Sequence, residues 1–304
     1  MRDTPIHVPD RIRAARDAGW PIVALESTVI AHGLPYPHNL SLARAMEDEV
    51  RAAGATPATV GVVGGVPIVG MTVEQIERFA QADNILKLSR RDISYAVAMR
   101  RDGATTVAAT MALAAVAGVT VFATGGIGGV HRGARESWDV SGDLTELART
   151  PVLVVCAGAK SILDLSATLE YLETAGVPVL GLATDEFPAF YSASSGLPIP
   201  ARVESPAEAA AVWRTHRALG GAGMLLAVPP PAAVALPHAE VEAAIGRALE
   251  RAAAAGVRGP AVTPFLLAAV AEETGGESLR ANIALLRQNA SVAAQVAREL
   301  AHMV

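Results

Sequence analysis

Lysine is rare in this chain, which makes the two lysines that remain informative. Of the 25 basic residues, two are lysines, Lys87 and Lys160, and the others are arginines. A guanidinium group keeps its proton and cannot act as a nucleophile, whereas a desolvated lysine can become neutral and attack a carbonyl carbon. A lysine retained against this bias indicates a position that needs an amine; a surface lysine that escaped the bias is the alternative.

Lys160 stands at a point in the chain where α/β proteins bind ligands. It follows the apolar run Val152–Cys156 through Ala157-Gly158-Ala159, so we expect it at the C-terminal end of a strand. The sequence also predicts a helix beginning at Ser161. The N-terminus of that helix would disfavour the charged ammonium and lower the pKa of Lys160. We therefore interpret Lys160 as a candidate nucleophile.

Two further segments carry polar groups next to expected elements. Lys87 lies just before an expected helix start at Ser89–Asp92, and Ser89 is its first residue. An ammonium, a hydroxyl and free backbone N–H groups suit a phosphate. Glu26 ends the first apolar strand, where a carboxyl group tends to have a raised pKa and can act as a general acid. The alternatives are a solvated loop lysine and a carboxylate bound by neighbouring N–H groups.

The run Thr124–His131 has four glycines within five residues. Such glycines allow positive φ angles and let backbone N–H groups converge on an anion. The spacing is not G-x-G-x-x-G and no Walker lysine follows, so the sequence predicts neither a dinucleotide site nor a P-loop. A plain flexible loop is the alternative.

The run Trp138–Leu144 supplies Asp139, Ser141 and Asp143 within five residues. Hard oxygen ligands in a turn suit Mg²⁺ or Mn²⁺. Asp143 could instead cap the helix that runs to Arg149, so the residues alone leave a metal site and a helix cap both open.

Composition sets the broad class. The chain has 304 residues, 51% of them hydrophobic and 18% charged, which is enough for a large core. A net charge of −5 argues against a nucleic-acid partner. The single cysteine, Cys156, excludes an intramolecular disulfide and is interpreted as a buried strand residue in a reducing compartment. No signal peptide or membrane helix is predicted, so we expect a cytoplasmic protein.

Apolar runs and helical segments alternate along the chain. This alternation predicts a largely parallel or mixed sheet with helices on both faces, a three-layer α/β/α sandwich, in one domain over residues 1–304. Helix starts are expected at Thr72–Gln75, Ser89–Asp92 and Ser205–Glu208. Helices are expected at 238–255, 264–274 and 277–301. The expected strands are Pro21–Leu25, Val60–Val69, Val119–Ala123, Val152–Cys156, Val177–Leu182 and Met224–Val228.

These motifs, taken in order, resemble those of the pseudouridine-5′-phosphate glycosidases, a family that includes proteins of the indigoidine synthase A type. The likeness covers roughly residues 10–300. The opening motif is the run from Ala24 to Pro35. The later ones are Lys87–Asp92, Thr105–Met111, Phe122–His131, Ser137–Asp143, Cys156–Ser161, Thr263-Pro264-Phe265 and the helix around Asn282.

The resemblance implies a single-domain α/β/α sandwich that assembles as a homotrimer. It implies reversible conversion of pseudouridine 5′-phosphate and water to ribose 5-phosphate and uracil, with one Mn²⁺ per subunit held by Asp139. It implies Lys160 as the Schiff-base nucleophile and Glu26 as the proton donor. The implied substrate contacts are Lys87, Val107, Ser141, Gly142 and Asp143; the matching motifs add Ser89, Thr124, His131 and Asn282.

The glycosidic bond of pseudouridine 5′-phosphate explains why a lysine and an acid would be paired. Because it joins C1′ to C5 of uracil, cleavage needs an electron sink at C1′ and a proton for the departing carbon. Three other functions remain open: another Schiff-base lyase or aldolase of phosphosugars, an accessory protein of indigoidine-type pigment biosynthesis, and a non-enzymatic phosphosugar sensor.

Overall fold

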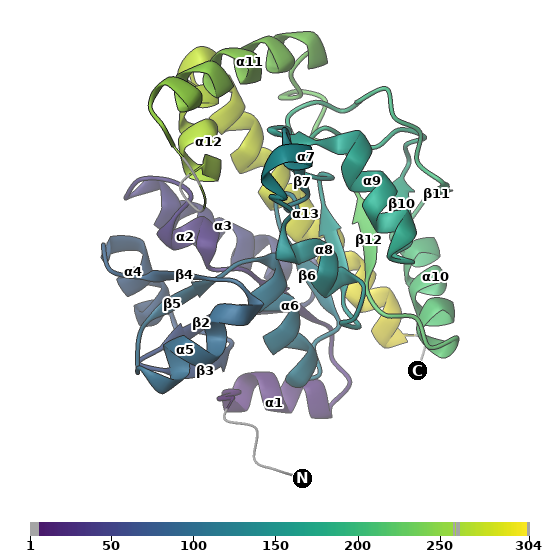
Figure 1. The fold of residues 1–304 in the computed structure, drawn as a ribbon. Helices are drawn as coiled ribbons and strands as arrows, with labels where there is room; N and C mark the ends of the chain where they lie inside the picture. Colours follow the sequence, from purple (N-terminus) through teal and green to yellow (C-terminus); the bar gives the residue numbers. More distant parts are fainter. Residues whose placement is uncertain (1–5, 258, 260–261, 303–304) are drawn as a thin grey trace.

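The fold is built on a ten-stranded, mostly parallel sheet (Figure 1). The structure is a computed structural model and describes residues 6–257, 259 and 262–302. The strands lie in the order β11-β10-β12-β8-β6-β1-β2-β5-β4, with β3 pairing with β2. Their bounds are β1 Ile22–Leu25, β2 Thr56–Val63, β3 Val66–Val69, β4 Leu86–Leu88, β5 Gly103–Thr105, β6 Val121–Ala123, β8 Leu153–Cys156, β10 Val179–Leu182, β11 Ala201–Val203 and β12 Met224–Ala227. Among the strands of this sheet that the structure describes, β2–β3 and β2–β5 are antiparallel pairs and the others are parallel.

Helices cover both faces of the sheet, so the predicted fold class is confirmed (Figure 1). On one face, α13 (Glu277–His302) packs across β1, β6 and β8, flanked by α3 (His38–Ala52) and α10 (Pro206–Ala218). On the other face, α6 (Val107–Val116) packs on β1, β2 and α8 (Gly142–Leu147). The remaining helices are α1 Asp10–Asp17, α2 Thr28–Ala31, α4 Val73–Gln81, α5 Ile93–Ala98, α7 Ala134–Ser137, α9 Leu165–Thr174, α11 His238–Ala254 and α12 Val262–Glu273, with a 3-10 turn at Arg90–Asp92.

Most local predictions hold, and the exceptions have clear causes. Ser205 and Thr72 cap α10 and α4 as expected. The run Val60–Val69 was predicted as one strand and is a hairpin instead. Its turn, Gly64-Gly65, has φ angles of 57° and 83°, and consecutive glycines supply that left-handed conformation without strain.

The prediction of a helix beginning at Ser161 is wrong. After Lys160 the chain makes a turn and enters the short strand β9 (Leu163–Asp164), which pairs with β7 (Val130–His131). The helix α9 begins only at Leu165, where the Asp164 side chain accepts a hydrogen bond from the Ala167 N–H. Lys160 therefore does not lie at a helix N-terminus, and a helix dipole cannot be the cause of any special reactivity.

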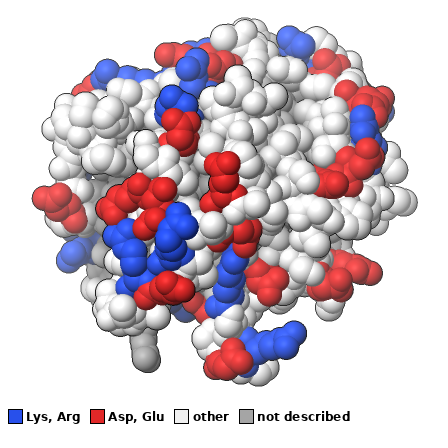
Figure 2. Space-filling view, turned by 90° about the horizontal axis from the view of Figure 1, so that it is seen from above, with Lys and Arg blue, Asp and Glu red and all other residues white. Residues whose placement is uncertain are grey.

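Charged side chains of both signs are interspersed on one face of the molecule. On the face seen from above, Lys and Arg side chains lie among Asp and Glu side chains and form no continuous basic area on that face (Figure 2). No helix within the described residues is both long enough and apolar enough to cross a membrane.

Cys156 is expected to be chemically inert in the native protein. It is fully buried in β8, and burial raises the pKa of its thiol to about 12. Because the pKa is raised, the thiol stays protonated through mildly alkaline pH and forms little nucleophilic thiolate. Iodoacetamide should leave Cys156 unmodified in native protein and alkylate it in urea, as read by intact mass. Rapid alkylation before unfolding would contradict this.

Candidate active site

A large cavity opens at the carboxyl ends of the central strands. Its volume is about 910 Å³. It is lined by all twelve residues singled out from the sequence: Glu26, Lys87, Ser89, Val107, Thr124, His131, Asp139, Ser141, Gly142, Asp143, Lys160 and Asn282. The structure thus brings together motifs that span most of the chain, while the role of each residue stays a prediction.

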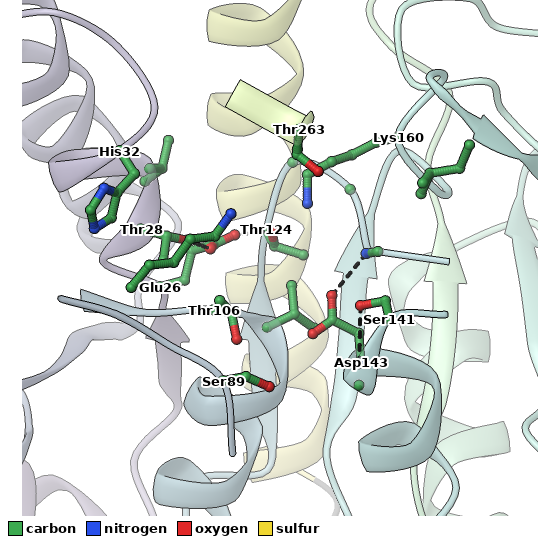
Figure 3. Close-up of a pocket in the computed structure, with 18 of the residues that line it drawn as sticks. Glu26, Thr28, His32, Ser89, Thr106, Thr124, Ser141, Asp143, Lys160 and Thr263 are labelled. Carbon is green, nitrogen blue, oxygen red and sulfur yellow. Dashed lines mark hydrogen bonds between the residues drawn. The ribbon is translucent and has the colours of Figure 1, made fainter. Parts of the chain in front are cut away.

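The strand order explains why Lys160, Thr124 and Glu26 meet. In the sheet, β6 lies between β8 and β1, and the three strands run parallel. Glu26 directly follows β1, Thr124 directly follows β6, and Lys160 follows β8 after a short turn. The carboxyl ends of parallel strands share one edge of a sheet, so these side chains converge there (Figure 3).

The turn that carries Lys160 depends on Gly158. Its φ is 78°, and a Cβ at this position would lie 2.2 Å from the Pro188 carbonyl oxygen. The Lys160 N–H donates to the Ile127 carbonyl at 3.1 Å, and the Lys160 carbonyl accepts from the Leu163 N–H at 3.0 Å. Backbone contacts therefore hold this residue on both sides, and its side chain extends into the cavity (Figure 3).

Glu26 is buried, and hydroxyl groups bind both of its oxygens. Thr28 Oγ1 donates to one carboxyl oxygen and Thr124 Oγ1 donates to the other. A buried carboxyl group is costly unless it is hydrogen-bonded, and these two hydroxyls meet that requirement. They also fix the direction in which Glu26 faces, next to the cavity (Figure 3).

Lys87 projects from β4 into the same cavity as Lys160. Burial by the surrounding protein lowers the pKa of Lys87, and the charge of Lys160 lowers it further. The carboxyl groups of Glu26 and Asp143 act in the opposite sense. The cavity therefore holds two amines and at least two carboxyl groups close enough to influence one another.

The glycines of the Thr124–His131 loop serve a different purpose from the one predicted. Positive φ angles were expected, but none of the four glycines has one. Lack of space explains them instead: a Cβ on Gly126 would lie 2.6 Å from the Phe190 ring, and one on Gly128 would lie 2.3 Å from Ser141 Oγ. The Gly128 N–H donates to Asp143, so that group is not available to an anion.

Asp143 joins three parts of the site. Its Oδ1 accepts from the Ala108 N–H at the start of α6 at 2.9 Å, and its Oδ2 accepts from the Gly128 N–H at 2.8 Å. The alternative of Asp143 as the cap of α8 is wrong, because the Ser141 hydroxyl caps that helix by accepting from the Asp143 N–H. Asp143 is buried and both of its oxygens have partners, so it acts as a structural cross-link at the edge of the cavity.

Asp139 is the carboxylate best placed to hold a cation. Its half-exposed side chain lines the cavity and lies 3.7 Å from Nδ1 of His131. In the described part of the chain, no three His, Cys, Asp or Glu side chains cluster as a metal-binding group. Mg²⁺ and Mn²⁺ are commonly held by one or two carboxylates, with water and substrate phosphate completing the shell, and Asp139 fits a site of that kind.

Sequence reasoning missed a buried carboxylate that holds two arginines at the cavity. Glu146 is fully buried and accepts from Arg90 Nη1 at 2.6 Å and from Arg149 Nη2 at 2.6 Å. Both arginines line the cavity near Ser89. Its role at the cavity could not be predicted, because its partner Arg90 lies 56 residues away. Phe190, which lines the cavity with a φ of 61°, was also missed.

The fold and cavity define an α/β protein whose site pairs lysines with carboxyl groups at the ends of parallel strands. Comparison with known proteins agrees: the family model described as "Indigoidine synthase A like protein" matches residues 11–299. The chain belongs to this family.

Named relatives are similar over nearly the whole chain. Pseudouridine-5′-phosphate glycosidase of Roseiflexus sp. (strain RS-1) is 71% identical over 97% of this chain and 96% of that protein. The protein of the same name from Chloroflexus aurantiacus is 62% identical, over 98% and 99% of the two chains.

Two solved structures share the fold. The prealnumycin C-glycosynthase AlnA, in complex with ribulose 5-phosphate, has a TM-score of 0.92 and 42% identity, covering 99% of this chain and 98% of that one. An indigoidine synthase A-like protein from Thermotoga maritima has a TM-score of 0.89 and 36% identity, covering 99% of each chain.

Replacing Asp143 by Asn should destabilise the protein. The amide has one acceptor oxygen for two N–H donors, and its NH₂ group would face the other donor. Leaving a buried donor unpaired costs about 1–3 kcal/mol, which urea denaturation would measure. The control is Asp164→Asn, at the N-cap of α9, where asparagine is nearly as good a cap as aspartate. Equal losses in both variants would contradict the cross-linking role.

Proposed function

We propose that this chain cleaves the bond between C1′ of ribose and C5 of uracil in pseudouridine 5′-phosphate, reversibly, giving ribose 5-phosphate and uracil. One observation carries the proposal: Lys160 and Glu26 follow strands on either side of β6 and line one cavity. It is supported by 71% identity to a relative named for this substrate. The homotrimer and the cytoplasmic location, which the resemblance and the composition led us to expect, belong to the same proposal.

Lys160 would supply the nucleophile. Its neutral amine adds to C1′ as the ribose ring opens, and the ring oxygen takes up a proton. The nitrogen lone pair then forms an iminium with C1′ as the bond to C5 breaks, and the bonding electrons go to the uracil carbon. Water adds to the iminium, which releases ribose 5-phosphate and returns the free amine.

Glu26 would supply the proton for C5 of uracil. Its two hydroxyl partners, Thr28 and Thr124, hold the carboxyl group in a fixed direction beside the cavity. A positioned acid is needed at this step because a carbon leaving group must be protonated as the bond breaks. The proton released when the iminium is hydrolysed restores the acid.

The phosphate would bind among hydroxyl and cationic groups around Ser89. Ser89, Arg90 and Arg149 line one part of the cavity, and Lys87 projects into it. Val107 begins α6, whose N-terminus favours an anion. Ser141, Gly142, His131 and Asn282 line the rest of the cavity and would contact the sugar and the base.

Asp139 would hold the divalent metal, for which we propose Mn²⁺. When bound, such an ion supplies positive charge that orients substrate oxygens and water. His131 would remain next to the metal-bound carboxylate without a charge of its own, because burial lowers its pKa against the opposing effect of Asp139.

Lys160 should form a covalent adduct during turnover. Borohydride added to enzyme and pseudouridine 5′-phosphate should leave a ribose phosphate on Lys160. Lys160→Ala and Lys160→Arg should each lose at least about 10³-fold in kcat, because neither side chain can add to C1′. Peptide mapping has one other lysine to consider, Lys87. An adduct on Lys87, or an active Lys160→Arg variant, would disprove the mechanism.

Removal of metal should abolish activity, and Mn²⁺ should restore it. Asp139→Asn should raise the Mn²⁺ concentration for half-maximal activity by more than about 10-fold, since a neutral amide replaces a charged ligand. Asp48→Asn, at an exposed aspartate paired with Arg51, is the control. Full turnover in chelator-treated enzyme would remove the metal from the proposal.

A second function is favoured by one observation. The similar solved structure of a C-glycosynthase holds ribulose 5-phosphate, so formation of a C-glycosidic bond from a phosphosugar is the related alternative. Product analysis separates the two: release of uracil from pseudouridine 5′-phosphate supports cleavage, whereas no release, with adducts formed only from free phosphosugars, supports the alternative.

A further inference from the structure

Arg132 links the turn that carries Lys160 to helix α11. Its Nε donates to the Leu163 carbonyl at 3.3 Å, and its Nη2 donates to the Ser161 carbonyl at 3.0 Å. Its Nη1 and Nη2 also donate to the two carboxylate oxygens of Glu242 at 3.0 and 2.7 Å. One guanidinium group thus contacts both residues that bracket the end of the turn and a carboxylate on a separate helix.

The turn after Lys160 needs such support because no helix stabilises it. Residues 161 and 162 form a turn, and the following β9 has only two residues. The Ser161 hydroxyl is buried and has no hydrogen-bond partner, so the Ser161 side chain does not anchor the turn. The carbonyl groups of Ser161 and Leu163 therefore depend on Arg132 for their side-chain contacts.

Glu242 fixes the orientation of Arg132 and links it, through α11 and α12, to the cavity wall. Both side chains are about one-third exposed, at 31% and 34%, so their ion pair is partly shielded from solvent. Glu242 lies on α11, which packs against α12, and α12 contributes Thr263, Pro264 and Leu267 to the cavity wall. By contrast, Arg251 of α11 pairs with Glu272 and Glu273 at the end of α12, away from the Lys160 turn.

We propose that Arg132 is a positioning residue for Lys160 and that Glu242 holds Arg132 in place. The proposal rests on the proposed function, in which Lys160 attacks C1′. The planar guanidinium can serve two carbonyls and a carboxylate at once, whereas a lysine ammonium offers no such fixed fork. Displacement of a nucleophile by about 1 Å can cost about 10²-fold in rate, so a turn loosened beside Lys160 reduces chemistry more than substrate binding.

The test compares kcat and KM in variants of the pair. Arg132→Gln should lower kcat by about 10–100-fold while KM changes by less than about 3-fold, because the proposed phosphate contacts are untouched. Arg132→Lys and Glu242→Gln should give smaller losses of kcat in the same direction. Arg251→Gln breaks an ion pair on the same helix and should behave like the wild-type protein.

A charge exchange separates positioning from simple stabilisation. Arg132→Glu combined with Glu242→Arg can restore the ion pair between the helix and the loop, but a glutamate at 132 cannot donate to the carbonyls of Ser161 and Leu163. The double variant should therefore regain the thermal stability that the single variants lose, but its kcat should stay as low as in those single variants. Recovery of kcat would overturn the proposal, as would an unchanged kcat in Arg132→Gln.

Hydrogen exchange keeps this test independent of the substrate assignment. In Glu242→Gln and Arg132→Gln, the amide hydrogens of Lys160 and Leu163 should exchange faster than in Arg251→Gln. If wild-type protein releases no uracil, the proposed function fails while this measurement still decides whether Arg132 supports the turn. Unchanged exchange in both variants would overturn the proposal, and if Arg132→Gln does not fold, Glu242→Gln decides alone.

Discussion

The parallel pairing of β1, β6 and β8 determines where the candidate site forms. Leu25 pairs with Ala123, and Ala123 pairs with Val155, so three strands from distant parts of the chain end at nearly the same level. Each strand is buried and apolar, and the first polar side chains appear where the strands end. The hydrogen bonds of the sheet thus set the relative heights of Glu26 and Thr124, and the turn after β8, held by the Ile127 and Leu163 backbone, places Lys160 beside them.

Charged groups at the cavity are held by partners that come from other elements. Asp143 binds N–H groups of α6 and the glycine loop, and Glu146 binds Arg90 and Arg149. An unpaired buried charge is costly, so such groups persist only where every oxygen has a donor. These contacts join the segments after β4 and β6 to α6 and α8, and they make the cavity wall a connected structure.

The sequence predicted which residues meet but not how they are held. Residues such as Glu26, Lys87 and Lys160 could be found because each lies next to an expected strand end or helix start, and strand order places such ends together. Val107, Gly142 and Asn282 were implied only by the resemblance to the family. The helix after Lys160 was mispredicted because β9 forms only by pairing with β7, a contact about 30 residues away that no local pattern records. Glu146, Phe190 and Arg132 were missed for the same reason, since their partners are set by the tertiary fold.

The bias toward arginine becomes intelligible once both lysines are located. Arg44, Arg247 and Arg287 form ion pairs with about half of each side chain exposed to solvent, where a permanently charged, multiply hydrogen-bonding group suits Glu partners. Lys87 and Lys160 instead share one cavity, in which protein atoms and a second amine disfavour the charged form of Lys87. A guanidinium cannot relieve that repulsion by losing its proton, whereas an amine can. A site that needs an uncharged nitrogen would therefore retain lysine even in a chain where arginine has replaced it almost everywhere else.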